Sequence, residues 1–357
     1  MGDLASRWRQ LRYLAIFGAL LLLAACNFPT QPSGNLVQTA VALTLTAQLT
    51  HGPAQTQAPD ETPQPGSTPV ATSALDGYPE PTGKIVYTCQ YSKRSGFNQL
   101  CIINADGSGQ RILTSTAFSD DFFASISPDG ASVLFASDRA GRYQIYELVL
   151  ETEQLIQLTD FEDMHAYAPD VSPDGSRIVF YARTSGTYPS SHNVWVMNRD
   201  GSNAHAITNR PGGAWDPVWS PDGAYILFAS ESGGTPQLYI VAADGSDPTR
   251  VTNLNGIRGR NDWSSDGVTL TTYIGTAWDR DIYTFDLAGE NLRQLTDGFN
   301  NLAPSFSPDG NWITFMSYRD HPREDLGCEI YIMRVDGADP RRLTDNDICD
   351  WQPRWGP

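Results

Sequence analysis

The stretch Trp215-Asp216-Pro217-Val218-Trp219-Ser220-Pro221-Asp222-Gly223 joins an alternating, aromatic segment to a turn. In such a turn proline fixes φ, aspartate tolerates and caps the bend, and glycine adopts the positive φ. The Ser-Pro-Asp-Gly turn returns at residues 127–130, 172–175 and 307–310, and in the degenerate form Ser-Ser-Asp-Gly at residues 264–267. A strand-and-turn unit that recurs along one chain predicts a repeat architecture.

Two further markers give the length of the repeat. A Leu, Ile or Val followed by Thr recurs at intervals of 45, 49, 44, 44 and 48 residues, at positions 113–114, 158–159, 207–208, 251–252, 295–296 and 343–344. An Asp-Gly pair precedes four of these, at positions 106–107, 200–201, 244–245 and 336–337. Between the markers, β-branched and aromatic residues alternate with period two, which is typical of strands. A period of about 45 residues with four short strands predicts propeller blades.

The ends of the repeat region predict how the ring closes. The first unit, residues 83–114, has candidates for three outer strands but none for an inner strand. The last residues, 351–357 (WQPRWGP), match the inner-strand pattern of residues 215–221 (WDPVWSP). We therefore expect an all-β protein with a six-bladed β-propeller of four-stranded blades over residues 83–357, whose first blade is completed by the C-terminal strand. Such closure leaves no sheet edge unpaired. The aromatic residues that recur at one place of the inner strands are expected to pack between blades: Trp219, Trp263, Phe306 and Trp355.

The first residues have the pattern of an export signal. Arg7, Arg9 and Arg12 precede an apolar run that is too short for a membrane span. The end of this run, residues 23–26 (LAAC), resembles a bacterial lipobox. That resemblance implies cleavage of residues 1–25, lipidation of Cys26, and a mature chain anchored to the membrane and facing the periplasm or the cell exterior. The alternative is an ordinary cleaved signal followed by a coincidental cysteine.

Residues 26–82 are expected to form a flexible linker. Beyond the lipidated cysteine they are rich in Thr, Pro, Gln, Ala and Ser and carry hardly a charge. Such a segment cannot bury enough apolar surface to offset its chain entropy. We interpret it as a tether that gives the propeller reach from the membrane.

The composition of the chain limits its partners. It has 24 Lys and Arg against 41 Asp and Glu, a net charge of −17. Because this charge repels phosphate backbones, no nucleic-acid partner is expected. The 31 Gly and 24 Pro disfavour long helices. We expect a monomer.

The repeat units resemble the β-propeller repeats of the TolB family over the whole of residues 83–357. This resemblance implies a propeller in a bacterial envelope protein. TolB proper carries an additional N-terminal α/β domain, and in this chain the tether stands in its place.

Four cysteines remain after lipidation of Cys26. An even number outside the cytoplasm predicts two disulfides. The expected positions in the blades favour Cys89–Cys101, on neighbouring strands of one blade, and Cys328–Cys349, on one rim. A Cys89–Cys349 bond, which would join the closing strand directly, and free buried thiols are the alternatives.

A candidate ligand site lies where the repeat departs from its own pattern. In the fifth blade residues 258–263 (RGRNDW) replace the usual inner strand, and nearby rim loops carry more cationic and aromatic side chains. The candidate site residues are Arg258, Arg260, Asp262, Trp278, Arg280, Arg319, His321 and Arg323. Their arginines are suited to hold the carboxylate of a peptide or of a uronic acid. The alternative is ion pairs with the neighbouring Asp279, Asp281, Asp320 and Asp325.

The sequence predicts no catalytic residue, metal ligand or cofactor. It has neither a Gly-x-Ser-x-Gly elbow nor a His-Glu-x-x-His motif, and the Asp-Gly pairs are the expected turn residues rather than calcium ligands. The leading hypothesis is a non-enzymatic envelope propeller that binds a protein or peptide. The alternative is a carbohydrate-binding or uronic-acid-lyase-like propeller with an Arg- and His-rich mouth, to which His165, His192 and His321 would contribute; ordinary surface histidines are the simpler account of these three.

Overall fold

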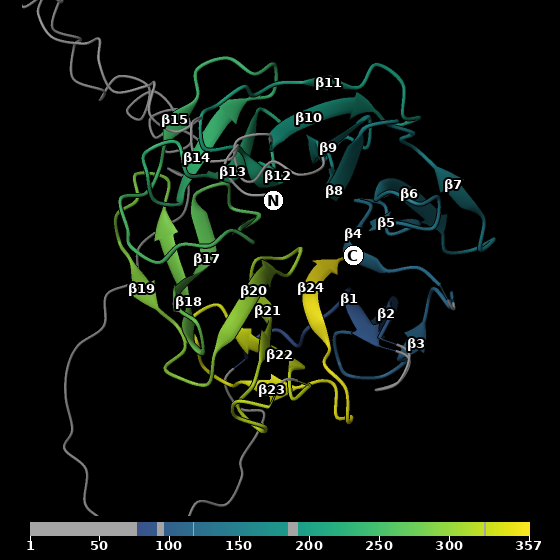
Figure 1. The fold of residues 1–357 in the computed structure, drawn as a ribbon. Coiled ribbons are helices and arrows are strands. Elements are labelled where there is room, and N and C mark those ends of the chain that lie inside the picture. Colours follow the sequence, from purple (N-terminus) through teal and green to yellow (C-terminus); the bar gives the residue numbers. More distant parts are fainter. Residues whose placement is uncertain (1–76, 91–95, 117, 185–191, 325) are drawn as a thin grey trace, which may run out of the picture. The chain divides into compact units, whose positions relative to one another are not determined.

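The computed structural model describes residues 77–90, 96–116, 118–184, 192–324 and 326–357. These residues form 24 β-strands arranged as six four-stranded antiparallel sheets around a central axis (Figure 1). The signal peptide predicted for residues 1–25, the lipidation site Cys26 and the linker up to residue 76 lie outside the described residues. The structure confirms the six-bladed, all-β propeller and the four-stranded blades.

Each blade runs from an inner strand at the axis to a short outer strand. Blade one is β24 (Trp351–Gly356), β1 (Lys84–Gln90), β2 (Asn98–Asn104) and β3 (Arg111–Ile112). Blade two is β4 (Asp121–Ile126), β5 (Ser132–Ser137), β6 (Gln144–Val149) and β7 (Leu155–Gln157). Blade three is β8 (Met164–Val171), β9 (Arg177–Thr184), β10 (Asn193–Asn198) and β11 (His205–Ala206).

The other three blades follow the same order. Blade four is β12 (Trp215–Trp219), β13 (Tyr225–Ser230), β14 (Gln237–Ala242) and β15 (Thr249–Arg250). Blade five is β16 (Asp262–Trp263), β17 (Thr269–Thr276), β18 (Asp279–Asp286) and β19 (Arg293–Gln294). Blade six is β20 (Asn301–Phe306), β21 (Trp312–Ser317), β22 (Glu329–Arg334) and β23 (Arg341–Arg342).

The C-terminal strand closes the ring, as the sequence predicts. β24 pairs antiparallel with β1, with Trp355 opposite Ile85 and Gly356 opposite Lys84. In Figure 1 the end of the chain in β24 therefore lies beside its first strand.

The repeated threonine holds the outer part of every blade together. Its hydroxyl oxygen accepts the backbone N–H at the start of the third strand at 2.9–3.0 Å in all six blades, for example Thr252 Oγ1 from Leu238 N. The repeated turn is equally regular, because its serine hydroxyl donates to its aspartate at 2.5–2.6 Å in all four Ser-Pro-Asp-Gly copies. Both markers therefore recur for local hydrogen-bonding reasons.

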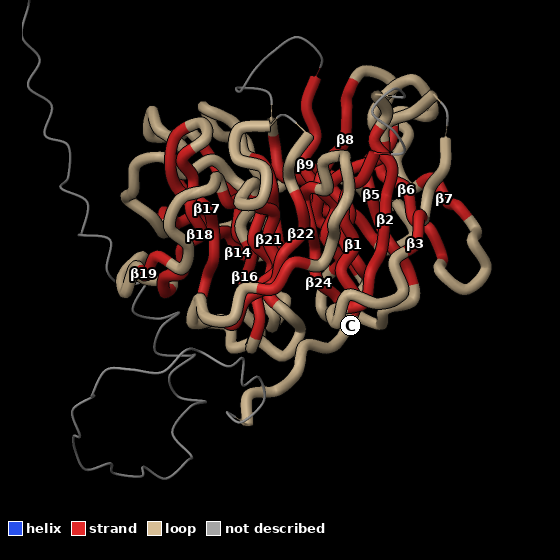
Figure 2. The backbone as a smooth tube through the Cα atoms, turned by 90° about the horizontal axis from the view of Figure 1, so that it is seen from below, coloured by secondary structure: helices blue, strands red, loops and turns tan. Residues whose placement is uncertain are grey.

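The blades expose two different faces, which Figure 2 shows edge-on. The turn face carries the Ser-Pro-Asp-Gly and Asp-Gly turns and the end of β24. The linker face, on the opposite side, carries the loops between second and third strands and the segments that join one blade to the next. All candidate site residues except Arg260 and Asp262, which lie inside the ring, belong to the linker face.

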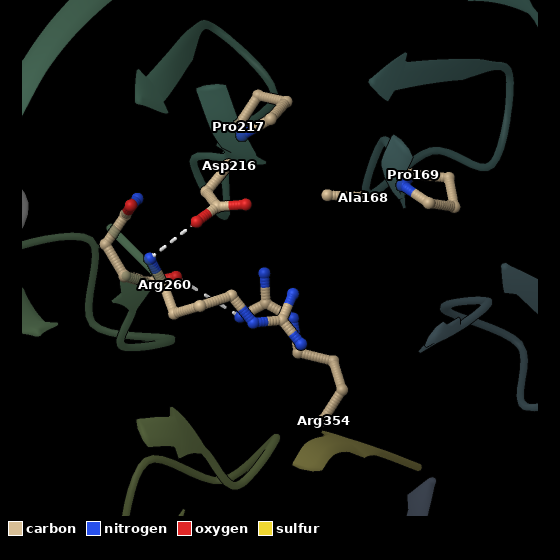
Figure 3. A pocket seen from close by; sticks show the side chains of 7 residues that line it. Ala168, Pro169, Asp216, Pro217, Arg260 and Arg354 are labelled. Carbon is tan, nitrogen blue, oxygen red and sulfur yellow. Dashed lines mark hydrogen bonds between the residues drawn. The ribbon is translucent and has the colours of Figure 1, made fainter. Parts of the chain in front are cut away.

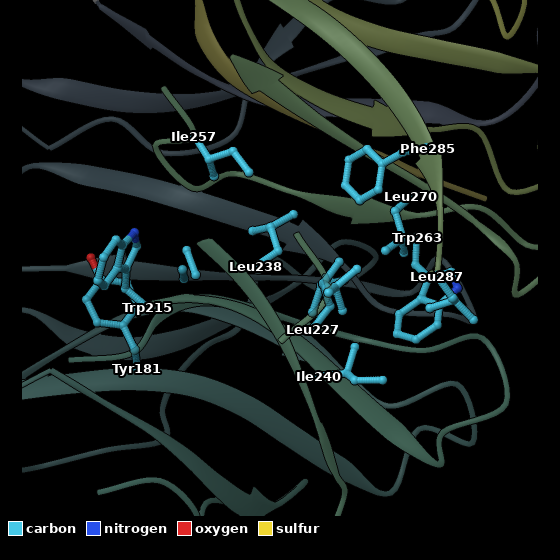
Figure 4. Close-up of a cluster of buried hydrophobic side chains, with 14 of the residues drawn as sticks. Tyr181, Trp215, Leu227, Leu238, Ile240, Ile257, Trp263, Leu270, Phe285 and Leu287 are labelled. Carbon is cyan, nitrogen blue, oxygen red and sulfur yellow. The ribbon is translucent and has the colours of Figure 1, made fainter. Parts of the chain in front are cut away.

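Apolar side chains fill the spaces between neighbouring blades. Figure 4 shows one such cluster, in which Leu227, Leu238 and Ile240 of blade four meet Trp263 and Phe285 of blade five. The recurring aromatic residues of the inner strands are 4–7% exposed, and each packs against the preceding blade: Trp219, Trp263, Phe306 and Trp355. Packing between blades is thus confirmed as their role.

The folded unit begins slightly before the boundary expected at Gly83. Trp355 Nε1 donates to the carbonyl of Thr82 at 2.8 Å, and Trp312 Nε1 donates to that of Pro79 at 2.9 Å. The ring of Tyr78 packs edge-on against Trp312, with the two centroids 5.6 Å apart. The described chain therefore starts on the turn face, against blade six.

Two disulfides connect Cys89 with Cys101 and Cys328 with Cys349, the pairing favoured from the sequence. The first joins neighbouring strands β1 and β2 of blade one. The second joins blade six, just before β22, to the segment that leads into the closing strand β24. The described part of the chain contains no helix of the length and apolarity that crossing a bilayer requires.

We expect the second disulfide to stabilise the closed ring. Replacing both of its cysteines (Cys328→Ser with Cys349→Ser) should lower the free energy of unfolding by about 3 kcal/mol, because the bond constrains a loop of moderate length in the unfolded chain. Urea unfolding under oxidising conditions measures this, with Cys89→Ser, Cys101→Ser as the comparison within one blade. A double variant as stable as the unchanged chain would contradict the expectation.

Candidate functional site

Every inner strand is kinked at the same place around the axis. The kinked residue is not glycine, yet it has a positive φ of 47–56° in all six blades: Phe123, Ala168, Asp216, Arg260, Ala303 and Gln352. In five blades the pairing with the second strand shifts register across this point, as a β-bulge requires. In blade five β16 pairs with β17 only over Asp262 and Trp263, so Arg260 precedes the paired strand but has the same positive φ. A bulge re-aims the side chain at its position, and in Figure 3 both Asp216 and Arg260 extend toward the central axis.

Polar side chains beside these bulges fasten neighbouring blades to one another. Each accepts a backbone N–H of the next inner strand: Asp170 from Trp219 at 2.9 Å, Asp216 from Arg260 at 3.0 Å, Asp262 from Phe306 at 2.8 Å, Ser305 from Trp355 at 3.1 Å and Gln352 from Phe123 at 3.2 Å. Five of the six junctions are joined in this way. At the sixth, between blades two and three, the hydroxyl of Ser125 is buried without a hydrogen-bond partner.

Two arginines cross the channel in opposite directions. Arg354 of blade one reaches blade five, where it forms an ion pair with Asp262 at 3.0 Å and donates to the carbonyl of Asn261 at 3.3 Å. Arg260 of blade five reaches blades one and two, where it donates to the carbonyl of Gln352 at 3.4 Å and lies 5.1 Å from the ring centroid of Phe123. Their two guanidinium groups lie close together near the axis (Figure 3), and they narrow the channel there.

Burial changes the protonation of these groups. Desolvation raises the pKa of Asp170 to about 6 and also raises that of Asp216, although nearby arginines act against it. Desolvation lowers the pKa of Arg260 to about 10. Burial acts in the same direction on Arg354, but the carboxylates of Asp262, Asp170 and Asp216 outweigh it and raise the pKa of this residue. Both arginines are therefore cations at neutral pH.

On the linker side of these arginines the channel mouth is lined by aromatic rings. Phe122 lies 4.9 Å from Tyr143, 6.1 Å from Tyr167 and 6.4 Å from Trp351, centroid to centroid. Tyr167 in turn stacks on Tyr181 at 5.2 Å. The aromatic wall thus spans blades one, two and three.

The blade-five wall of the mouth is cationic. Tyr273 of blade five lies under the guanidinium of Arg280, 6.0 Å from its ring centroid. Burial raises the pKa of Tyr273 to about 12, and the charges of Arg280, Arg260 and Arg258 act on the same phenol. Arg258 lies in the segment that leads into β16, and Arg280 lies at the linker-face end of β18, whereas Arg260 lies deeper in the channel.

The structure divides the candidate site residues into separate groups. Arg258, Arg260 and Arg280 converge at the mouth, and the buried Asp262 pairs with Arg354 inside the ring. Arg319 instead packs over the rings of Phe315 and Tyr331 in blade six. The others lie in exposed loops of the linker face: Trp278, whose ring contacts Tyr318 at 5.2 Å, His321, which is 3.8 Å from Glu324, and Arg323.

The rim histidines have aromatic surroundings. His165 stacks on Tyr167 with centroids 6.0 Å apart, and His192 lies 5.7 Å from Tyr181. Burial lowers the pKa of His165, and it lowers that of His192 to about 4. Both rings are neutral at physiological pH. Among the described residues no group of His, Cys, Asp and Glu has the arrangement of a metal site.

The sequence analysis missed several residues of the channel. Arg354, Asp170 and Asp216 belong to it, as do Tyr273 and the aromatic wall. Alignment of the six inner strands residue by residue would have found the first of these, because Arg354 occupies the position of Val218 in an otherwise matching segment.

The sequence matches the family described as TolB beta propeller domain over residues 79–189 and 148–357. It is 35% identical over 165 residues to a TolB homologue of Chlorobium chlorochromatii, covering 43% of this chain and 36% of that protein. It is 34% identical over 275 residues to the Tol-Pal system protein TolB of Francisella tularensis, covering 75% of this chain and 61% of that protein. The matches thus cover less than two thirds of either relative.

Solved structures confirm the likeness of fold. TolB from Acinetobacter baumannii superposes with a TM-score of 0.69 at 24% identity, over 79% of this chain and 69% of that one. An oligogalacturonate lyase in complex with manganese superposes with a TM-score of 0.52 at 16% identity, over 74% of each chain. At these identities the superpositions establish the fold alone.

Proposed function

The chain belongs to the TolB β-propeller domain family, and from this premise we propose that it is a non-enzymatic envelope protein whose linker face binds a protein or peptide. We propose the same organisation as from the sequence: a signal peptide over residues 1–25, lipidation of Cys26, a linker, and a propeller that starts close to residue 83. The protein would be exported and lipid-anchored. The two disulfides support an oxidising compartment outside the cytoplasm.

The distribution of exposed aromatic side chains carries this proposal. Phe118, Trp278 and Phe299 are 89%, 41% and 54% exposed, and all three lie in loops of the linker face. The other large exposed apolar residues among those described are aliphatic and lie in or beside the outermost strands: Ile112, Leu155 and Leu292. Aromatic residues and arginines dominate the binding energy of protein interfaces, so the linker face has the composition of a docking surface.

The use of the channel carboxylates supports a binding rather than a catalytic role. Asp170, Asp216 and Asp262 each accept a backbone N–H of the next blade, and Asp262 also neutralises Arg354. These contacts show that the three carboxylates at the axis connect neighbouring blades. The described chain also begins on the turn face, opposite the linker face.

Site-specific photocross-linking in cells tests the docking surface. A photoreactive phenylalanine analogue at Phe118, Trp278 or Phe299 is expected to give one shared protein adduct. The same analogue at Ile112 or Leu155, which are similarly apolar and exposed but lie on outer strands, is the matched control and should not give it. Adducts from the outer strands alone would contradict the proposed face.

A further inference from the structure

We infer that the mouth of the channel on the linker face binds a carboxylate of an acidic protein segment through Arg258, Arg260, Arg280 and Tyr273. This inference rests on the proposed function and adds the chemistry of the anchoring group. It concerns only the blade-five side of the mouth.

The cations at this place have no ion-pair partner among the described residues. Within the described parts of the chain no carboxylate lies within 4.0 Å of a side-chain nitrogen of Arg258, Arg260 or Arg280, so the alternative of ion pairs with neighbouring aspartates does not apply to these three arginines. The Nε of Arg280 is buried without a hydrogen-bond partner. The guanidinium of Arg260 has only the carbonyl of Gln352, at 3.4 Å, and the ring of Phe123. In a chain of net charge −17, three arginines without ion pairs at one mouth favour an anionic ligand.

The side-chain groups that meet there are almost all donors. The phenol of Tyr273 is protonated at every physiological pH, because burial raises its pKa to about 12. It therefore offers an O–H to the same space in which the guanidinium groups offer N–H. Asp216 is the carboxylate that acts on both Arg260 and Tyr273, and it already accepts the backbone N–H of Arg260 at 3.0 Å. A ligand carboxylate would supply the ion pair that Arg258, Arg260 and Arg280 lack among the described residues.

The shape of the channel limits how the ligand enters. Arg260 and Arg354 cross the axis directly beneath the mouth (Figure 3). A bound peptide therefore cannot pass through the channel without displacing these two side chains. A single side chain can reach the arginines from the linker face. The aromatic wall of Phe122, Tyr143 and Trp351 lies on the other side of the mouth. There it can contact apolar residues that neighbour the acidic residue in the bound segment.

An acidic protein segment fits this surface better than a uronic acid. The exposed Phe118, Trp278 and Phe299 lie in three different loops, and a broad aromatic rim is a feature of protein interfaces. A sugar acid would need only the mouth itself. The two ligands share the carboxylate, so the experiment must separate them.

Panning of a phage-displayed library of random dodecapeptides on the full chain tests the inference. We expect the selected peptides to carry Asp or Glu, and their affinity to fall at least tenfold when that residue is changed to Asn or Gln. Arg258→Gln and Arg280→Gln should each reduce the affinity by a similar factor. When the arginine change and the change of the acidic peptide residue are combined, the affinity should fall no further than with either change alone, because both remove the same interaction. Arg111→Gln, which removes an exposed arginine from β3, is the matched control and should bind normally.

The outcomes distinguish the anchor from the face. Peptides that lose affinity with Trp278→Ala but tolerate loss of their acidic residue would overturn the carboxylate anchor and leave the docking face standing. Peptides insensitive to every linker-face change would contradict both. Failure to select any acidic peptide overturns the carboxylate anchor. It is also overturned if digalacturonate binds with higher affinity than every selected peptide and this binding depends on Arg280.

Discussion

Replacing Arg354 by methionine is expected to lower the free energy of unfolding by about 3 to 5 kcal/mol, the usual cost of leaving one partner of a buried ion pair alone. Arg354 is the counter-charge of Asp262, whose nearest oxygen is 3.0 Å away, and both side chains are 12% exposed. Methionine keeps much of the apolar stem and removes the charge. Asp262 would then remain buried at the junction of blades five and six with only its bonds to Ser305 and Phe306.

A double-mutant cycle separates the pair from simple loss of packing. Asp262→Asn in the Arg354→Met background should recover part of the loss, because no uncompensated charge is then buried. Urea unfolding at neutral pH, followed by tryptophan fluorescence, measures all four proteins. Arg111→Met provides the exposed control and should change the free energy of unfolding by less than about 0.5 kcal/mol. If Arg354→Met costs as little as the control, the crossed arginines do not hold the ring.

The repeat made the fold predictable. The marker residues recur because each makes the same local hydrogen bonds, as Thr252 does with Leu238, and such bonds depend on residues close in sequence. Closure by residues 351–357 could be predicted for the same reason, since those residues copy the pattern of β12. The disulfides then followed from the strand positions of their cysteines.

The candidate site was only partly predictable, because it is made by side chains that meet across the ring. In blade five, Arg258, Arg260 and Arg280 all act on the phenol of Tyr273, so these three candidates lie near one another. Arg260 was expected only as part of a segment that replaces the inner strand, whereas the structure gives it a positive φ and directs its side chain into the channel, toward the carbonyl of Gln352, 92 residues away. Arg319 was grouped with it on charge alone, whereas its guanidinium lies over rings of its own blade. Periodicity identifies the blade of a residue, but the direction of its side chain depends on the bulge and on its neighbours.

Asp350→Asn is expected to stabilise the protein at pH 8 and to have no effect near pH 4. Asp350 is 1% exposed, immediately before the closing strand, and its side chain accepts from the amide of Asn346 at 2.8 Å. Burial, assisted by the charge of the neighbouring Glu329, raises its pKa to about 7. At the equivalent Asp121 of blade two, both carboxylate oxygens accept from Nη2 of Arg139 at 2.9 Å, and no such cation accompanies Asp350 among the described residues.

The sign of the effect follows from the raised pKa. A carboxyl group that binds its proton more tightly in the folded state stabilises that state fully below its unfolded pKa, near 4, and the contribution is lost as the pH rises through about 7. Asparagine does not titrate, so the variant should exceed the unchanged protein by about 2 to 4 kcal/mol at pH 8, with the difference closing between pH 7 and 4. Thermal and urea unfolding across this range measure it. Asp121→Asn is the control: it leaves Arg139 without its carboxylate partner and should destabilise the protein at pH 8. If Asp350→Asn is also destabilising at pH 8, the carboxylate of Asp350 has a compensating partner, and its burial does not destabilise the closed ring.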